Sequence, residues 1–487
     1  MHAYARPLCW LLVSLIVLLG PGTPSASAEP EWLERQTEHL VLRYTAGDEA
    51  EVGWYGEFVE DIYRQVSDIF GQEGRPGIVV TFYPDEAAYA VANPLARGED
   101  GVLAHARPLT REVGLALERL RKQSELLRRD AVRHELTHIV LADLSDNKLP
   151  IGFQEGLAQA VEQDGEQRAK LARILRRGAE VGQLLTFADL NRQRTFLARA
   201  SIAYPESYAM VQFLSEHYGF GHLVRMVGFL REEQGLDEAV RRAFGRSLEQ
   251  LEVEWQAALP RFLDGGWSRN DLDLWELGEP RRLFAEGNYA GAREGFERAS
   301  RLFGDLGRAE KLEQARMGLR QSSDAIEAVE LGRRGSTALE GHDYKTASDL
   351  LGRSEKLWSV VGDEGRHDLV RTELTQAQQG IEAMEQLEQA KALVGAWRLP
   401  EARETALVAG RSFVDLGDAE RTAEANLVLD EAQAVQNRLA IAALGGGSVG
   451  LAAIGLAWGL SRRPRLPMTP TYPARPALAA HEHDWSL

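Results

Sequence analysis

The pattern of apolar and polar positions divides the chain into two parts. Between residues 30 and 120, short strand-like runs mix with helical stretches. The strand-like runs lie at 39–44, 77–83 and 113–117, and a helical stretch lies at 49–70. From residue 123 the apolar positions follow a helical period, and from about residue 272 no strand pattern remains. We expect an α+β domain over residues 29–265 and an all-α region over residues 272–436.

The all-α region contains an internal repeat with a period of 55 residues. Its landmarks are an aromatic or leucine (Tyr289, Tyr344, Leu399), an alanine (Ala292, Ala347, Ala402), an aromatic (Phe303, Trp358, Phe413) and a glycine (Gly307, Gly362, Gly417). A small residue at a helix crossing and a glycine at the following turn are typical of a unit of two or three helices. The region resembles a tetratricopeptide-like solenoid, although that unit is usually about 34 residues long. Such a solenoid presents a concave face for a peptide or a partner protein, and a rigid spacer is the alternative.

The N-terminus has the pattern of a secretory signal. An apolar stretch from Leu8 to Leu19 follows Arg6 and precedes the small residues Ala26-Ser27-Ala28. We expect residues 1–28 to be removed after Ala28, so that the main body is exported.

A second apolar stretch lies near the C-terminus. Residues 439–460 carry no charge and are long enough to cross about 30 Å of hydrocarbon as a helix. Arg462, Arg463 and Arg465 follow at once, which favours the cytoplasm for that side. The pattern predicts a single transmembrane helix, a main body on the periplasmic or extracellular side of the cell membrane, and a disordered, proline-rich cytoplasmic tail at 461–487.

Composition excludes several classes of function. The 487 residues exceed a typical single domain, and the net charge of −17 gives no basic surface for nucleic acid. Cys9 is the single cysteine and lies within the predicted signal, so neither disulfides nor a cysteine nucleophile are expected in the mature protein.

The chemistry-bearing motif is His134-Glu135-Leu136-Thr137-His138, within a helical run. Four residues make about one helical turn, so His134 and His138 project side by side and can hold one metal ion. Glu135 stands beside that ion without having to bind it. A zinc ion with an open position lowers the pKa of its bound water to about 7, and a neighbouring carboxylate can take the proton as the water attacks a carbonyl.

A third ligand follows after a polar, turn-rich segment. Residues 143–150 allow the chain to reverse into a second helix, which would return Glu155 to the histidine pair. The alternative is that the histidines are ordinary helix residues and Glu155 is a surface charge. A helix whose apolar residues mark it as a core element has little reason to carry these groups without a metal. The sequence therefore predicts one catalytic Zn²⁺ bound by His134, His138 and Glu155.

These motifs resemble the peptidase MA-like zinc metallopeptidases, which have the gluzincin arrangement of an HExxH motif and a later glutamate. The resemblance rests on His134 to His138 and on Glu155-Gly156-Leu157-Ala158, and covers roughly residues 35–262. It continues through residues 203–208, 213–214, 217–219, 243–245 and 251–255. It implies a zincin-like fold, His134, His138 and Glu155 as ligands, and Glu135 as the acid or base. It also implies a donor to the developing oxyanion, for which Tyr204 and Tyr208 are both candidates.

Two positions depart from the family pattern. Gly152 stands where the family often has an aromatic residue, and Gln159 where it often has an acidic one. We expect Gly152 to widen the cleft and Gln159 to weaken the orientation of a ligand.

The sequence predicts a membrane-tethered, exported zinc endopeptidase with peptide or protein substrates, which the helical repeats recruit or position. The alternative is a catalytically silent zincin-fold scaffold that binds proteins through its repeats. The presence of Glu135 favours the enzyme, because degenerate copies usually lose the base.

Overall fold

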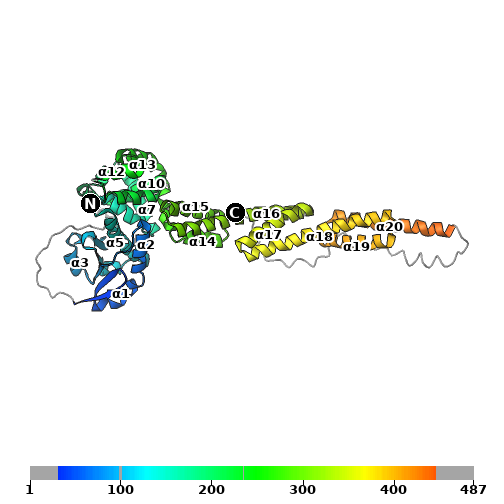
Figure 1. Ribbon diagram of the computed structural model, residues 1–487, viewed down its shortest axis with the longest axis horizontal. Coiled ribbons are helices and arrows are strands. Elements are labelled where there is room, and N and C mark those ends of the chain that lie inside the picture. The colour runs from blue at the N-terminus through cyan, green and yellow to red at the C-terminus, as the bar shows by residue number, and fades with distance from the viewer. Residues whose placement is uncertain (1–30, 98–100, 234, 446–487) are drawn as a thin grey trace, which may run out of the picture. The chain divides into compact units, whose positions relative to one another are not determined.

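The computed structural model describes residues 31–97, 101–233 and 235–445 (Figure 1). The structure is 75% helical, with a small five-stranded sheet and a helical C-terminal region. The predicted fold class, in which an α+β domain and a transmembrane helix were central, is therefore wrong. The physical reason is that the last strand ends at Ala116, and every later described element is a helix.

No described helix combines the length and the apolarity that crossing a membrane requires. Of the predicted span, residues 439–445 form the end of a long helix that begins at Ala419 and carries charged side chains along most of its length. Residues 446–460 lie outside the described residues, as do the predicted signal at 1–28 and the predicted tail at 461–487.

The chain forms two compact units. Among the described residues, the first contains those between 31 and 279 and residues 295–316, and the second contains residues 280–294 and 317–445. Helices α15 and α16 therefore contribute to both units.

The sheet lies in the first unit and has the order β1-β2-β3-β5-β4. Its strands are β1 (Trp32–Gln36), β2 (Leu40–Thr45), β3 (Ile78–Tyr83), β4 (Ala104–Arg107) and β5 (Glu112–Ala116). The three central strands are parallel, whereas β1 and β4 are antiparallel edges. Leu40, Leu42 and Tyr44 alternate into the core, which is the period expected of a strand with one buried face. The three predicted strands are confirmed as β2, β3 and β5.

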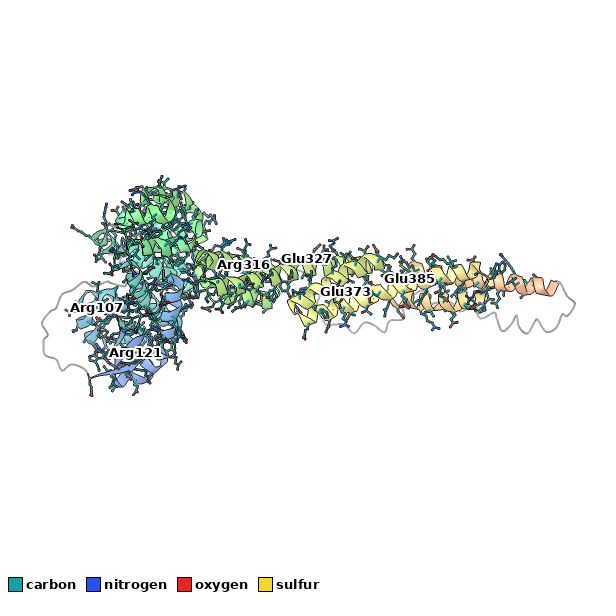
Figure 2. All side chains as sticks on the ribbon, viewed as in Figure 1. Arg107, Arg121, Arg316, Glu327, Glu373 and Glu385 are labelled. Atoms are coloured by element: carbon teal, nitrogen blue, oxygen red, sulfur yellow. The ribbon has the colours of Figure 1, made fainter. Side chains whose placement is uncertain are left out.

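Short helices surround the sheet. They are α1 (Glu49–Gly56), α2 (Val59–Phe70), α3 (Glu86–Ala92) and α4 (Leu117–Leu120). The predicted helical stretch at 49–70 is confirmed, with a break at Phe58, and α2 ends at Gly71 in the left-handed conformation that glycine adopts without strain. Arg121, which follows α4 and is labelled in Figure 2, pairs with Asp48 at 2.6 Å and with Glu51 at 2.7 Å. These ion pairs attach the turn after α4 to the start of α1.

Two helices form the centre of the first unit. Helix α5 (Glu125–Ser145) packs against α2, α11 and β4, and α6 (Ile151–Ala160) packs against α5 and α10. The remaining helices are α7 (Gly165–Glu180), α8 (Phe187–Leu190), α9 (Gln193–Ala198), α10 (Ala200–Tyr218), α11 (Phe220–Phe229), α12 (Leu236–Phe244) and α13 (Leu248–Leu263). Helix α10 is buried from Ile202 to Leu214, and α6 packs against it.

The later helices alternate between short and long. They are α14 (Gly278–Ala285), α15 (Tyr289–Asp305), α16 (Ala309–Glu340), α17 (Tyr344–Val361), α18 (Glu364–Gly395), α19 (Leu399–Asp415) and α20 (Ala419–Gly445). Within the second unit, α18 packs against both α17 and α19, and α19 packs against α20 (Figure 1). One short and one long helix make up each 55-residue repeat. The likeness to tetratricopeptide units stays a prediction, since a 32-residue helix such as α18 is about as long as one whole unit of that family.

A tyrosine links successive repeats in the second unit. The hydroxyl of Tyr289 donates to Asp363, and that of Tyr344 donates to Asp418, at 3.3 and 3.0 Å. Both aspartates stand just before a long helix and accept a backbone N–H of its first turn. The third repeat has Leu399 at the tyrosine position, and its side chain is buried without such a link.

Candidate metal centre

Helix α5 carries the histidine pair in the core. It begins after Ser124, whose hydroxyl accepts the N–H of Leu127 at 3.2 Å, and every residue from Asp130 to Leu141 is buried. The rings of His134 and His138 lie one turn apart, with 5.0 Å between their centroids. The spacing in the sequence therefore produces the expected side-by-side arrangement.

A tight reversal returns the chain to this pair. Asp146 and Asn147 have φ values of 55° and 54°, a left-handed conformation that aspartate and asparagine tolerate best among residues with a Cβ. Helix α6 then starts after Pro150. Gly156 allows α6 to approach α10, because a Cβ at this position would lie 2.3 Å from the carbonyl oxygen of Ser207. This close packing fixes the helix that carries Glu155.

His134, His138 and Glu155 converge on one point. Glu155 Oε2 lies 3.3 Å from His134 Nε2 and 3.8 Å from His138 Nε2, and one ligand atom from each residue fits within 4.8 Å of the others. All three side chains are 0% exposed. Ligand atoms around a tetrahedral zinc ion at about 2.0–2.1 Å stand roughly 3.3 Å apart, so the donor set is close to the required size.

The pKa values of these groups are shifted in opposite directions. Burial lowers the pKa of His134, but hydrogen bonds to Glu155 and Glu162 outweigh it and hold the pKa well above its usual value. Burial, helped by the charge of His134, pushes the pKa of His138 well below its usual value. Burial also raises the pKa of Glu155. Several acidic groups thus share a dry site with one neutral histidine, an arrangement that a divalent cation would stabilise.

His134 has a hydrogen-bonded carboxylate outside the proposed ligand set, whereas His138 makes no ring hydrogen bond among the described residues. His134 Nδ1 lies 2.6 Å from Glu162 Oε1, and Glu162 is 3% exposed. Neither ring nitrogen of His138 has a hydrogen-bond partner in the described part of the chain. The two histidines are therefore held in different ways.

Glu135 and Tyr204 are buried beside the three candidate ligands. Both are 0% exposed. Burial raises the pKa of Tyr204 well above its usual value, and the charges of Glu155 and Glu135 raise it further. The phenol therefore lies within electrostatic reach of both carboxylates.

Tyr208 faces a different neighbourhood. Its hydroxyl donates to the carbonyl oxygen of Trp267 at 3.3 Å, and burial raises its pKa, with the nearby Arg168 opposing that shift. Of the two predicted tyrosines, Tyr204 therefore lies near the carboxylates of the cluster, whereas the hydroxyl of Tyr208 contacts the backbone at Trp267.

The structure does not show the expected widening at Gly152, whereas the weaker orientation expected from Gln159 stays a prediction. An added Cβ at Gly152 would lie 2.8 Å from the carbonyl oxygen of Leu190 and 3.0 Å from Asn191 Oδ1, so neighbouring atoms fill the space that glycine leaves. Gln159 is buried, and its Oε1 has no hydrogen-bond partner among the described residues. Glu162, about one turn further along, lies 2.6 Å from His134 Nδ1, so His134 has an acidic partner.

Sequence reasoning missed Glu162 and Asp130. Asp130 precedes His134 by one helical turn, and Glu162 follows Glu155 by two. An acidic residue at helical spacing from each predicted ligand was the signal that could have found them.

A second group with ligand-type side chains lies at the start of the sheet. It consists of Glu38, His39 and Glu60 and is partly exposed. Glu60 already accepts hydrogen bonds from the Thr37 hydroxyl at 2.5 Å and from the backbone and ring nitrogens of His39 at 3.2 and 2.5 Å. The carboxylate therefore has a structural role, joining β2 to α2.

Comparison with known proteins agrees with the geometry of the first unit. Residues 122–261 match the family model of the Peptidase MA superfamily, and this segment contains all the candidate site residues. The match covers less than half of the chain and supports a metallopeptidase-like domain of the MA clan. No curated protein and no solved structure matches the chain.

The residues present fit a metal ion of the kind typical of that superfamily, which is zinc. Two imidazoles and one carboxylate are a common ligand set of hydrolytic zinc sites. In the described part of the chain, Glu155 Oε1 and His138 Nε2 are buried without hydrogen-bond partners, and a metal would satisfy them. His134, His138 and Glu155 form a group that could hold it.

Proposed function

We propose that the protein is a zinc-dependent metallopeptidase that hydrolyses peptide bonds of protein substrates. The observation that carries the proposal is the buried convergence of His134, His138 and Glu155, with Glu135 on the same helix. The Peptidase MA match over this segment supports it.

Each residue has a role in this proposal. A zinc ion bound by His134, His138 and Glu155 would act as a Lewis acid and make water acidic enough to be deprotonated near neutral pH. Glu135 accepts the proton of the attacking water and returns it to the leaving amine. Tyr204 donates a hydrogen bond to the carbonyl oxygen as negative charge develops there.

The second unit supplies the proposed contact with protein substrate. Large apolar side chains are exposed on its helices and turns, including Val360 at 68%, Trp397 at 64% and Leu427 at 68%. Exposed aromatic and aliphatic side chains are the groups that anchor a partner protein when it binds. Trp397→Ala should raise KM for a folded protein substrate and leave KM for a short peptide unchanged, and equal effects on both would contradict recruitment.

The deciding experiment is hydrolysis of a peptide library by the full, zinc-loaded chain, read by mass spectrometry. Glu135→Gln is the matched variant, because it preserves shape and removes the basic carboxylate. We expect cleavage by the wild type, a decrease of about 10²- to 10⁴-fold in Glu135→Gln, and equal zinc content in both. Undiminished cleavage by the variant would contradict the role of Glu135. A zinc-loaded wild type that cleaves nothing would favour the alternative of a silent scaffold.

A further inference from the structure

A buried polar network outside the proposed ligands and catalytic groups joins α5 to the segment after α6. Its members are Asp130 and Arg133 on α5 and Glu162 with the backbone of residues 163 and 164. Asp130, Arg133 and Glu162 are 0, 5 and 3% exposed. Burying this many charged groups is costly, so a role is expected.

The contact between His134 and Glu162 fixes the imidazole. A carboxylate that lies 2.6 Å from Nδ1 accepts a proton from that nitrogen, so Nε2 is the nitrogen left to bind a metal. Nε2 is also the nitrogen that lies 3.3 Å from Glu155. The contact therefore selects the tautomer and the ring orientation that a metal at this point requires.

Glu162 reaches this position because α6 ends just before it. The backbone N–H of Glu162 donates to the carbonyl of Gln159 at 3.2 Å, which continues the helical turn beyond Ala160. Glu162 therefore lies about one turn beyond Gln159.

Asp130 holds the segment that follows. Its Oδ2 accepts the backbone N–H groups of Gln163 at 3.0 Å and of Asp164 at 2.9 Å. Its other oxygen is paired with Arg133, one turn along α5. Because Asp130 and His134 are on the same helix, one turn apart, the segment is attached to the element that carries the histidine.

We propose that Glu162 is a positioning residue that orients His134 toward a bound metal, and that Asp130 holds Glu162 in place through the backbone of residues 163 and 164. The inference rests on the proposed metal site and extends it. It predicts that metal affinity depends on two carboxylates that do not touch the metal, and that they act as one unit.

The test measures zinc dissociation constants of full-chain variants by competition with a chromophoric chelator. Glu162→Gln should weaken zinc binding by about 10- to 100-fold, because an amide is a poorer acceptor for the imidazole proton. Glu166→Gln is the matched control: Glu166 is an exposed acidic residue nearby, in the first turn of α7, and its replacement should leave the constant unchanged.

Asp130→Asn tests the second half of the proposal. It should weaken zinc binding by itself and add nothing when combined with Glu162→Gln, since it acts through Glu162. The visible absorption spectrum of the cobalt(II)-loaded protein reports the ligand field directly, and should shift in Glu162→Gln and stay unchanged in Glu166→Gln. A variant that is merely less stable would unfold at a lower temperature without this spectral shift.

The outcomes separate this inference from the proposed function. Zinc binding by the wild type, with equal affinity and an equal cobalt spectrum in Glu162→Gln, would overturn the role of Glu162 and leave the metallopeptidase intact. Additive effects of the two substitutions would overturn the role of Asp130. A wild type that binds no zinc would overturn the metal site and the inference with it.

Discussion

The two units place their charged groups in different ways. In the first unit, Asp130, Arg133, Glu155 and Glu162 are each at most 5% exposed and gather around His134. In the described residues of the second unit, Asp418 is the charged side chain that is buried, and it stands at the start of a helix. Other charges there lie on helix surfaces, as at Glu327, Glu373 and Glu385 (Figure 2).

This difference distinguishes polar contacts that hold helices together from charged groups that indicate a functional site. The tyrosine–aspartate contacts of the second unit recur at the repeat period, with Tyr289 to Asp363 and Tyr344 to Asp418 as successive copies, so the packing of the repeats explains them. The four buried charges named above in the first unit do not recur along the chain, and they gather around one histidine. A cluster of buried charges lowers stability, and this one has no copy in a repeat. It is therefore a stronger indication of a functional site than the repeated contacts are.

The largest expected effect comes from the ligand set. Glu155→Gln removes the one anionic ligand of a fully buried site, so zinc affinity should fall by more than the about 10- to 100-fold expected at Glu162. The measurement is the same chelator competition on the full chain. An unchanged zinc affinity in Glu155→Gln would mean that the metal binds elsewhere. The buried charges of the first unit would then no longer indicate a metal site.

The next effect concerns the two tyrosines of α10. Tyr204→Phe should lower kcat about 10²- to 10³-fold with little change in KM, because an oxyanion donor acts in the transition state. Tyr208→Phe is the matched control, since that hydroxyl donates to the carbonyl oxygen of Trp267. A larger loss of kcat in Tyr208→Phe would exchange the roles of the two residues.

The local elements of the site were predictable from the sequence. Helical spacing is enough to place His134 beside His138, and the turn-rich segment before α6 is enough to bring Glu155 back to them. Tyr204 and Tyr208 could not be separated in this way, because which hydroxyl turns toward the carboxylates depends on tertiary packing of α10. Glu162 was missed because its role depends on a contact with His134, which is 28 residues away in the sequence.

The fold was less predictable than the site. Strands β2, β3 and β5 alternate or are continuously apolar, whereas β1 and β4 are short edges that lack a clear pattern. The predicted fold class gave too much weight to strands, because every described element after Ala116 is a helix. A run of uncharged residues at 439–460 indicated a membrane span by composition, yet its first residues continue the helix of a repeat.

The third effect is a difference in pH dependence between the units. Burial raises the pKa of Glu206 in the first unit to about 8, so the folded state keeps a proton that the unfolded chain loses above about pH 4.5. Stability should therefore fall as pH rises from about 4.5 to about 8, by on the order of 1.4 kcal/mol per pH unit at most. Glu206→Gln, which carries no charge at any pH, should flatten this slope in thermal unfolding of the first unit. If the dependence of stability on pH were the same in Glu206→Gln, the assigned role of Glu206 would be wrong.

The smallest effect tests the second unit. Burial alone would raise the pKa of Asp418, but hydrogen bonds from Arg421 and Tyr344 lower it below its usual value. Its contribution to stability is therefore present above about pH 3.8 and is lost as pH falls below that value, the opposite sign to Glu206. Tyr344→Phe removes one of these bonds and should cost about 1 kcal/mol of stability. Tyr289→Phe should cost less, because its bond to Asp363 is longer, at 3.3 Å, and only part-buried. Neither variant should change kcat on a short peptide, since the repeats carry no residue of the proposed site; a loss of kcat in Tyr344→Phe would show that the repeat packing reaches the chemistry.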